Sequence, residues 1–116
     1  MKILFIINDA PGSEKTYNAL RMAMALQKEQ SSVDVLIFLM ADAVTCALPN
    51  QFTPQGYYNI ERMLKAIIAR GGHVKTCDTS ASARGIKELT FIEGIENSTM
   101  SQLTQWTIEV DKVLTF

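Results

Sequence analysis

A chain of 116 residues has room for one hydrophobic core, and 47% hydrophobic against 20% charged residues describes a globular protein, not a disordered one. The formal net charge of −1 and the scattered basic residues lack the positive patch of a nucleic-acid binder, so no direct nucleic-acid contact is expected. No apolar run approaches the roughly 20 residues that span a bilayer, and the short run after Lys2 lacks a signal-peptide cleavage site. These features predict a single cytoplasmic domain over residues 1–116 without a membrane partner.

The amino-terminal part of the chain predicts a βαβ unit. Lys2–Asn8 is a β-branched and aromatic run, typical of a strand buried on both faces. Ser13 is suited to cap a helix over Glu14–Glu29, whose apolar side chains recur at helical spacing. Val33–Met40 resumes the strand pattern, and a connection of this kind makes the two strands parallel.

A turn and a long loop are expected next. Asp42 stands where a helix N-cap would, ahead of a short turn over Ala43–Leu48 that contains Cys46. A loop rich in turn residues follows over Pro49–Gly56. It is long enough to be functional or to be held by a neighbouring subunit.

The next segment carries the clearest helical periodicity in the chain. Asn59 is a plausible cap, and Gly71 allows the left-handed conformation that ends a helix. The apolar residues between them fall at helical spacing: Ile60, Met63, Leu64, Ile67 and Ile68. A short third strand over His73–Thr76 follows, with Cys77 at its carboxyl end.

The carboxyl-terminal part is harder to interpret. Residues Ile86–Ile92 predict a short extended piece. Ser98 is suited to cap a helix over Thr99–Glu109, and Val110–Phe116 predicts a final strand. The alternation of strands and helices indicates an α/β fold: a three-layer domain with a mainly parallel sheet of four or five strands.

This fold class locates a candidate site. Ligands of open α/β sheets bind outside the carboxyl ends of the strands. The loops over residues 8–13, 41–58 and 77–85 would meet at that edge, which brings Cys46 and Cys77 to the same edge of the molecule.

Cys77 is the leading candidate for chemistry, as a reactive thiol on a strand-to-helix turn. A helix amino end or a guanidinium stabilises a thiolate, and Arg84-Gly85 closes the segment that follows. Asp78 works against this by raising the thiol pKa, and free cysteines are often buried and inert. Cys77 and Ser80 also have the spacing of a dithiol motif whose second thiol is replaced, which is weak evidence for redox exchange.

The other candidate sites are weaker. Cys46 fits a packing role, although it would form a redox pair with Cys77 if their Cα atoms came within about 7 Å. The Asn8–Ser13 loop lacks both phosphate-binding glycine motifs, so no nucleotide site is predicted there. His73 begins a strand, away from the proposed site, and is interpreted as structural or exposed. The sequence contains no metal-ligand cluster, and neither a metal nor a cofactor is predicted.

Several segments together resemble the DsrE/DsrF-like family, and within it the small YchN-type members. They are Phe38–Val44, Gly56–Ile60, Cys77 with Arg84–Ile86, and Trp106-Thr107 with Asp111–Phe116. The resemblance runs nearly end to end. It implies a single Rossmann-like α/β/α domain that assembles into homo-oligomers, often trimers or hexamers. Tyr57, Tyr58 and Trp106 are separate candidates for subunit contacts, because aromatic residues are enriched at interfaces, although single aromatic residues usually belong to the core.

The resemblance also implies a chemistry for Cys77. In the DsrE and TusD subunits of sulfur-relay complexes, the matching cysteine carries sulfur as a persulfide. The implied activity is of the sulfurtransferase type, with sulfur donor and acceptor proteins as partners and Arg84, Ser80 and Gly85 in supporting positions. YchN-type members can carry a second cysteine where this chain has Ser80, which leaves Cys77 as the single carrier. Two alternatives stay open: an oligomeric ligand-binding or scaffold module with an inert Cys77, and a redox protein that uses Cys46 and Cys77.

Overall fold

The computed structural model describes residues 1–55 and 57–116, so Gly56 of the predicted loop lies outside the described residues. It contains a five-stranded sheet in the order β4-β3-β2-β1-β5, and every neighbouring pair is parallel. The strands are β1 (Lys2–Ile7), β2 (Asp34–Leu39), β3 (His73–Cys77), β4 (Ile95–Ser98) and β5 (Lys112–Thr115). The helices are α1 (Glu14–Glu29), the 3₁₀ helix η1 (Ala41–Ala47), α2 (Ile60–Ala69), α3 (Asp78–Ala83) and α4 (Met100–Glu109). The α/β/α Rossmann-like fold expected from the sequence is thereby confirmed.

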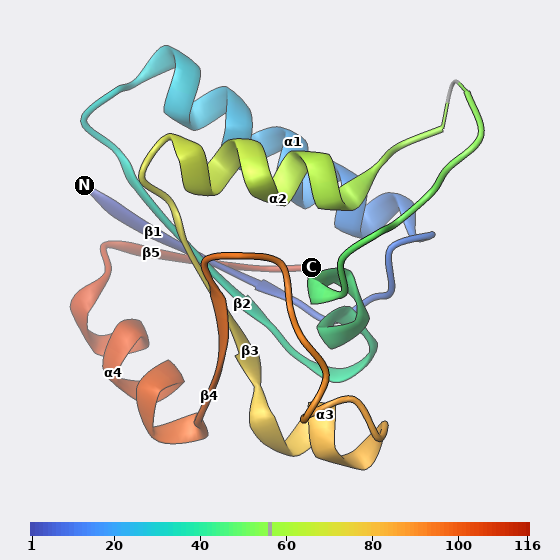
Figure 1. Cartoon of the computed structure of the whole chain (residues 1–116). Helices are drawn as coiled ribbons and strands as arrows, with labels where there is room; N and C mark the ends of the chain where they lie inside the picture. The colour runs from blue at the N-terminus through green and yellow to red at the C-terminus, as the bar shows by residue number, and fades with distance from the viewer. Residues whose placement is uncertain (56) are drawn as a thin grey trace.

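The helices form two layers, one on each face of the sheet (Figure 1). Successive strand residues point to opposite faces. Phe5 and Ile7 of β1 therefore pack beneath α1 and α2, whereas Leu4 packs on the other face with the α4 residues Leu103 and Trp106. The central strands need apolar residues at almost every position because both of their faces are covered.

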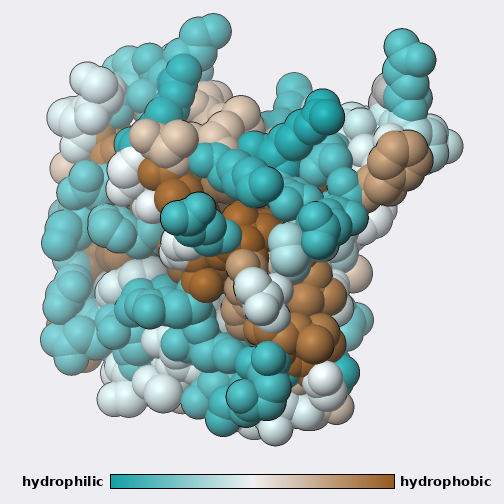
Figure 2. All heavy atoms as spheres, viewed as in Figure 1, coloured by the Kyte–Doolittle hydropathy of each residue, from teal (hydrophilic) through white to brown (hydrophobic). Residues whose placement is uncertain are grey.

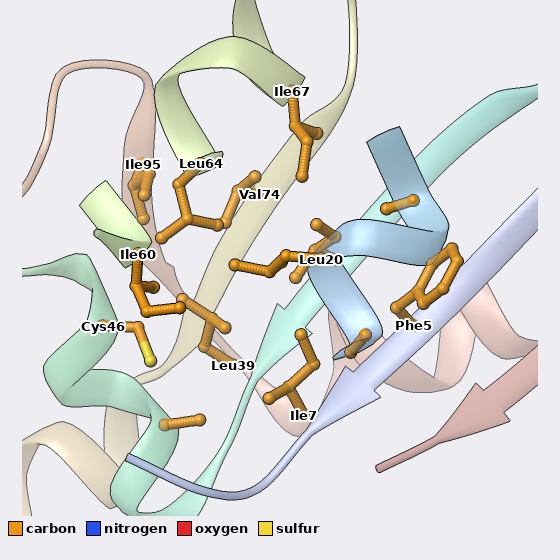
Figure 3. Close-up of a cluster of buried hydrophobic side chains, with 14 of the residues drawn as sticks. Phe5, Ile7, Leu20, Leu39, Cys46, Ile60, Leu64, Ile67, Val74 and Ile95 are labelled. Atoms are coloured by element: carbon orange, nitrogen blue, oxygen red, sulfur yellow. The ribbon is translucent and has the colours of Figure 1, made fainter. Parts of the chain in front are cut away.

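The α1/α2 side holds the larger of two buried clusters, in which Leu20, Ile60, Leu64 and Ile67 converge on the sheet (Figure 3). On the opposite side the Trp106 ring meets Phe38 edge-on, with 6.1 Å between ring centroids. Trp106 is only 7% exposed because it fills this cluster. Of the two roles open for Trp106, subunit contact and core packing, the structure shows core packing.

The predicted N-caps of α1 and α2 and the glycine beyond α2 are confirmed. The side chains of Ser13 and Asn59 cap α1 and α2 by accepting backbone hydrogen bonds from Lys15 and Arg62. Beyond the end of α2, Gly71 adopts a φ of 90°, the left-handed conformation that favours glycine.

Three local predictions are wrong. Asp42 does not cap η1: the N-cap is Met40, without a side-chain bond, and the Asp42 carboxylate binds Arg84 instead. Thr99, not Ser98, caps α4, because Ser98 is the last residue of β4. Residues 86–92 contain a turn, closed by the Leu89 N–H that donates to Ile86 O, and none of them belongs to a strand. Ile92 is buried, and its N–H donates to Ala47 O of η1.

The surface of one face is mixed in character (Figure 2). Hydrophobic side chains show through its middle and on the loop that projects toward the upper right, and hydrophilic side chains surround them. Phe52 belongs to this loop and is 94% exposed. Among the helices of residues 1–55 and 57–116, none is long and apolar enough to cross a membrane.

The same loop is tethered to α2 by Glu61. One Glu61 carboxylate oxygen accepts the Gln51 N–H at 2.7 Å, and the other lies 3.0 Å from the Lys65 ammonium. The Lys65 ammonium and the Gln51 N–H hold the pKa of the Glu61 carboxyl below its usual value. A lowered pKa means that the ionised form stabilises the folded state.

We therefore expect Glu61→Gln to lower the thermal unfolding midpoint at pH 7. Glutamine keeps the shape of the side chain, removes its charge and replaces one of the two accepting oxygens with an NH2 group. The contribution of Glu61 is present above about pH 4.3, the usual glutamate pKa, and is lost as the pH falls through the lower folded-state value. Thermal unfolding of both proteins across this pH range should show the two midpoints converging in acid. A constant difference at every pH would contradict a role for the charge.

Candidate active site

Cys77 is the last residue of β3 and the N-cap of α3. Its backbone is extended, and its sulfur accepts the Ser80 N–H with Sγ and N 3.4 Å apart. A hydrogen bond donated to sulfur favours the thiolate, the nucleophilic form. The side chain is 5% exposed and packs against Val44 and Ala81 in the cluster that also contains Trp106.

Ser80 connects the cysteine segment to the end of the neighbouring strand. Its hydroxyl oxygen accepts the Ala41 N–H at 3.0 Å. Ala41 follows β2 and has a φ of 50°, a left-handed conformation that is uncommon for a residue with a Cβ. The serine that stands where a second thiol could have been is thus a positioning residue in this structure, because it joins the β2 and β3 ends.

Arg84 forms a second connection between the same two segments. Its Nε and Nη2 lie 3.0 and 2.9 Å from Asp42 Oδ1, and its Nη1 donates to Ser80 O at 3.1 Å. Within the described residues, the guanidinium has no hydrogen bond to the Cys77 sulfur. No contact therefore supports the expectation that Arg84 stabilises the thiolate directly. Arg84 instead joins η1 to α3, and we call its bonds to Asp42 and Ser80 the latch.

Gly85 ends the segment. Its φ of 71° is left-handed, and its N–H donates to Ser82 O while the next N–H, from Ile86, donates to Ala81 O. This reversal directs the chain from α3 back toward the sheet, and a residue with a Cβ would be strained there.

Cys46 occupies a different environment. It belongs to the α1/α2 cluster, beside Ile60 and Leu39 (Figure 3). Cys77 belongs to the cluster on the opposite face. It is fully buried, and its thiol lies 3.8 Å from Asp9 O. Burial raises the pKa of the Cys46 thiol to about 12. Both cysteines are free, so the structure contains no Cys46–Cys77 disulfide.

The three predicted loops do meet at one edge of the sheet. The Cys46–Asp9 contact joins η1 to the loop after β1, and the Ala41–Ser80 bond joins η1 to α3. The sequence did not identify Ala41 and Asp42 as site residues, and the pairing of Asp42 with Arg84 spans 42 positions. No short-range sequence pattern predicts such a contact.

The remaining predicted positions lie outside this site. His73 begins β3, at the strand end opposite Cys77, and is exposed. Within residues 1–55 and 57–116, histidine, cysteine and carboxylate side chains form no group of three or more that could hold a metal ion.

The latch role of Arg84 predicts an increase in the accessibility of Cys77 when the latch is broken. Both Arg84→Gln and Asp42→Asn should lower the free energy of unfolding by less than about 1 kcal/mol, because the ion pair is largely exposed. Both should also speed alkylation of Cys77 several-fold, since the latch no longer reinforces the Ala41–Ser80 hydrogen bond and the apolar packing of Ala81 with Val44. The measurement is the rate of iodoacetamide modification.

The Asp42→Asn variant is the matched control, because it breaks the same pair and keeps the Arg84 charge. If Arg84→Gln slowed the reaction while Asp42→Asn did not, the guanidinium would act on the thiolate and the latch interpretation would be wrong.

The burial of Cys46 predicts that it resists thiol reagents. A thiol with a pKa of about 12 has almost no thiolate at pH 8. A folded Cys77→Ser variant should therefore release almost no chromophore from an aromatic disulfide reagent, and one equivalent after unfolding. Rapid reaction of the folded variant would show that Cys46 is accessible.

Comparison with known proteins places this geometry in a family. The model of the DsrE/DsrF-like family matches residues 1–116. Protein YchN of Escherichia coli strain K12 is 47% identical over 116 residues, which cover 99% of this chain and 98% of YchN.

Solved structures agree with this assignment. The crystal structure of the E. coli ychN protein superposes with a TM-score of 0.94 at 46% identity, and covers 100% of this chain and 99% of that one. MTH1491 of Methanobacterium thermoautotrophicum, a protein of unknown function, shares the fold with a TM-score of 0.80 at 13% identity, over 99% and 98% of the two chains. The chain belongs to the DsrE/DsrF-like family.

Proposed function

We propose that this protein is a sulfur carrier in a sulfur relay and holds sulfane sulfur as a persulfide on Cys77. The observation that carries the proposal is the position of this thiol: it ends a central strand, caps α3 and accepts the Ser80 N–H at its sulfur. Membership of the DsrE/DsrF-like family supports it, because the resemblance implies persulfide chemistry at this cysteine.

The transfer step balances without an external oxidant or reductant. The Cys77 thiolate attacks the terminal sulfur of a donor persulfide, R–S–SH. The donor S–S bond breaks, R–S⁻ leaves, and Cys77–S–SH forms. Delivery repeats the exchange, with an acceptor thiolate attacking the terminal sulfur of Cys77–S–SH.

Cys77 is buried, so its sulfur must become accessible before this transfer can occur. Only 5% of the residue is accessible, and thiol exchange requires access to the sulfur. The donor must therefore displace α3, a helix of six residues that Ser80 and Arg84 hold to η1. These two tethers would control when the sulfur is reached.

Intact mass spectrometry tests the proposal. After incubation with a low-molecular-weight persulfide, the wild-type chain should gain the mass of one sulfur atom. The Cys46→Ala variant should gain it too, and the Cys77→Ser variant should not. No adduct on the wild type, or an equal adduct on Cys77→Ser, would reject Cys77 as the carrier.

The second candidate function is an oligomeric small-ligand-binding or scaffold module in which Cys77 is inert. The low exposure of Cys77 favours it. Its signature would be slow alkylation of Cys77 in the folded chain. A dithiol mechanism is less well supported, because Cys46 and Cys77 lie in clusters on opposite faces of the sheet.

The proposal includes a homo-oligomer, a trimer or a hexamer, working in the cytoplasm with donor and acceptor proteins. Exposed apolar side chains offer surfaces for subunit contact, since Phe52 is 94% and Met100 57% exposed. Sedimentation equilibrium of the full chain would give the subunit number, and a monomer would reject this part of the proposal.

A further inference from the structure

An open groove lies between α1 and the start of α2. These two helices cover one face of the sheet (Figure 1), and Cys77 belongs to the cluster on the other face. Its volume is about 850 Å³. This volume is in the range of small-ligand sites, roughly 300–1,000 Å³. The sulfur-carrier proposal makes no use of this groove.

Aromatic rings form one wall. The Tyr17 and Tyr58 rings are stacked, with centroids 3.3 Å apart and planes inclined by 6°. Tyr58 remains 44% exposed and Tyr57 73% exposed, both beside the groove. Half-buried methionines, Met24 and Met63, line the same space. Flat rings and adaptable thioethers favour a planar apolar group as the occupant.

The charge of the groove is positive. Arg21 and Arg62 both line it, and no carboxylate does within the described residues. Arg21 lies over the Tyr17 ring, 5.3 Å from its centroid, and among residues 1–55 and 57–116 its guanidinium makes one long 3.4 Å hydrogen bond, to the Asn18 side chain. In the described part of the chain, the Arg62 guanidinium has neither a hydrogen bond nor an ion pair. Two guanidiniums without carboxylate partners complement an anion, and a phosphate accepts bidentate hydrogen bonds from arginine.

We propose that this groove binds a planar aromatic ligand that carries an anionic group, of the nucleoside monophosphate class. Arg21 and Arg62 hold the phosphate, while the base packs against Tyr58 and the methionines. The location differs from the Asn8–Ser13 loop, where the sequence lacks the glycine motifs of a phosphate loop. The proposal stands independently of sulfur carriage at Cys77.

Isothermal titration of the full chain with three probes tests the ligand class: AMP, adenosine and inorganic phosphate. AMP should bind at least about tenfold more tightly than either part alone, because stacking and charge-assisted hydrogen bonds both contribute. Phosphate binding as tightly as AMP would show that the aromatic group is not recognised. Absence of AMP binding would equally overturn the proposal.

Variants test the place of binding. Arg21→Gln, Arg62→Gln and Tyr58→Leu should each weaken AMP binding about tenfold or more, the effect expected for losing one charge-assisted bond or one stacking contact. Lys15→Gln is the matched control, because it removes an exposed positive charge from α1 outside the groove. Equal weakening by Lys15→Gln would indicate nonspecific charge attraction. If the groove variants left AMP binding unchanged and instead lowered the oligomer mass in sedimentation, the occupant would be a second copy of the chain and the proposal would be wrong.

Discussion

Cys77→Ser should abolish the release of thiocyanate from sulfur-loaded protein. Cyanide removes the terminal sulfur of a persulfide as thiocyanate and leaves the cysteine thiol, so thiocyanate counts the sulfane sulfur carried. The wild type should release about one equivalent per chain, since Cys46 is fully buried with a pKa raised to about 12 and Cys77 is the remaining thiol. The variant should release none above the background of a protein treated without donor.

Cys46→Ala is the control for this experiment. The substitution removes the other thiol from the opposite face of the sheet and should leave the thiocyanate yield unchanged. A yield that fell by half in each single variant would show that both thiols carry sulfur. That result would contradict the single-carrier account.

A large loss of stability is expected when the buried cluster that contains Cys77 loses an aromatic ring. Phe38→Ala should lower the free energy of unfolding by about 3–5 kcal/mol, the usual range for removing a fully buried phenylalanine ring. Phe38 is fully buried in the cluster that contains Cys77, and its ring meets Trp106 edge-on. The measurement is the shift in the urea midpoint at constant slope.

Ile108→Ala provides the matched comparison. Ile108 lies on α4, as Trp106 does, but is 76% exposed. Its truncation should change the free energy of unfolding by no more than about 0.5 kcal/mol. A small effect of Phe38→Ala, or a large effect of Ile108→Ala, would contradict the assignment of buried and exposed faces of this layer.

The order of elements was predictable because each central strand carries its own signal. β1 and β2 are buried on both faces and therefore read as continuous apolar runs. The ends of α1 and α2 were equally clear, since Ser13 and Asn59 are capping residues and Gly71 is needed for its left-handed backbone.

Strand β4 was missed for a physical reason. It is an edge strand of four residues, paired only with β3, and only Ile95 among them is buried. Its remaining residues, Glu96, Asn97 and Ser98, have no strand signal of their own. Their conformation depends on pairing with β3, including the Thr76 hydroxyl bond to Asn97. Such tertiary contacts leave no local pattern in the sequence.

The candidate site, like the fold, was predictable from the sequence only in part. The position of Cys77 at a strand end followed from the local pattern, and so did its place at the carboxyl edge of the sheet. The roles of Ser80 and Arg84 did not, because both bind residues that follow β2: Ala41 and Asp42. The burial of Cys77 also depends on the packing of α3 and α4, which a linear pattern does not describe.

Peptide mapping of the sulfur-loaded wild-type chain identifies the residue that carries the sulfur. The protein is loaded with a persulfide donor, its free thiols are blocked, and it is digested and sequenced by tandem mass spectrometry. We expect the additional sulfur on the peptide that contains Cys77, and Cys46 without additional sulfur, either as a free thiol or carrying the blocking group alone. Sulfur located on Cys46, or on neither cysteine, would contradict the single-carrier account.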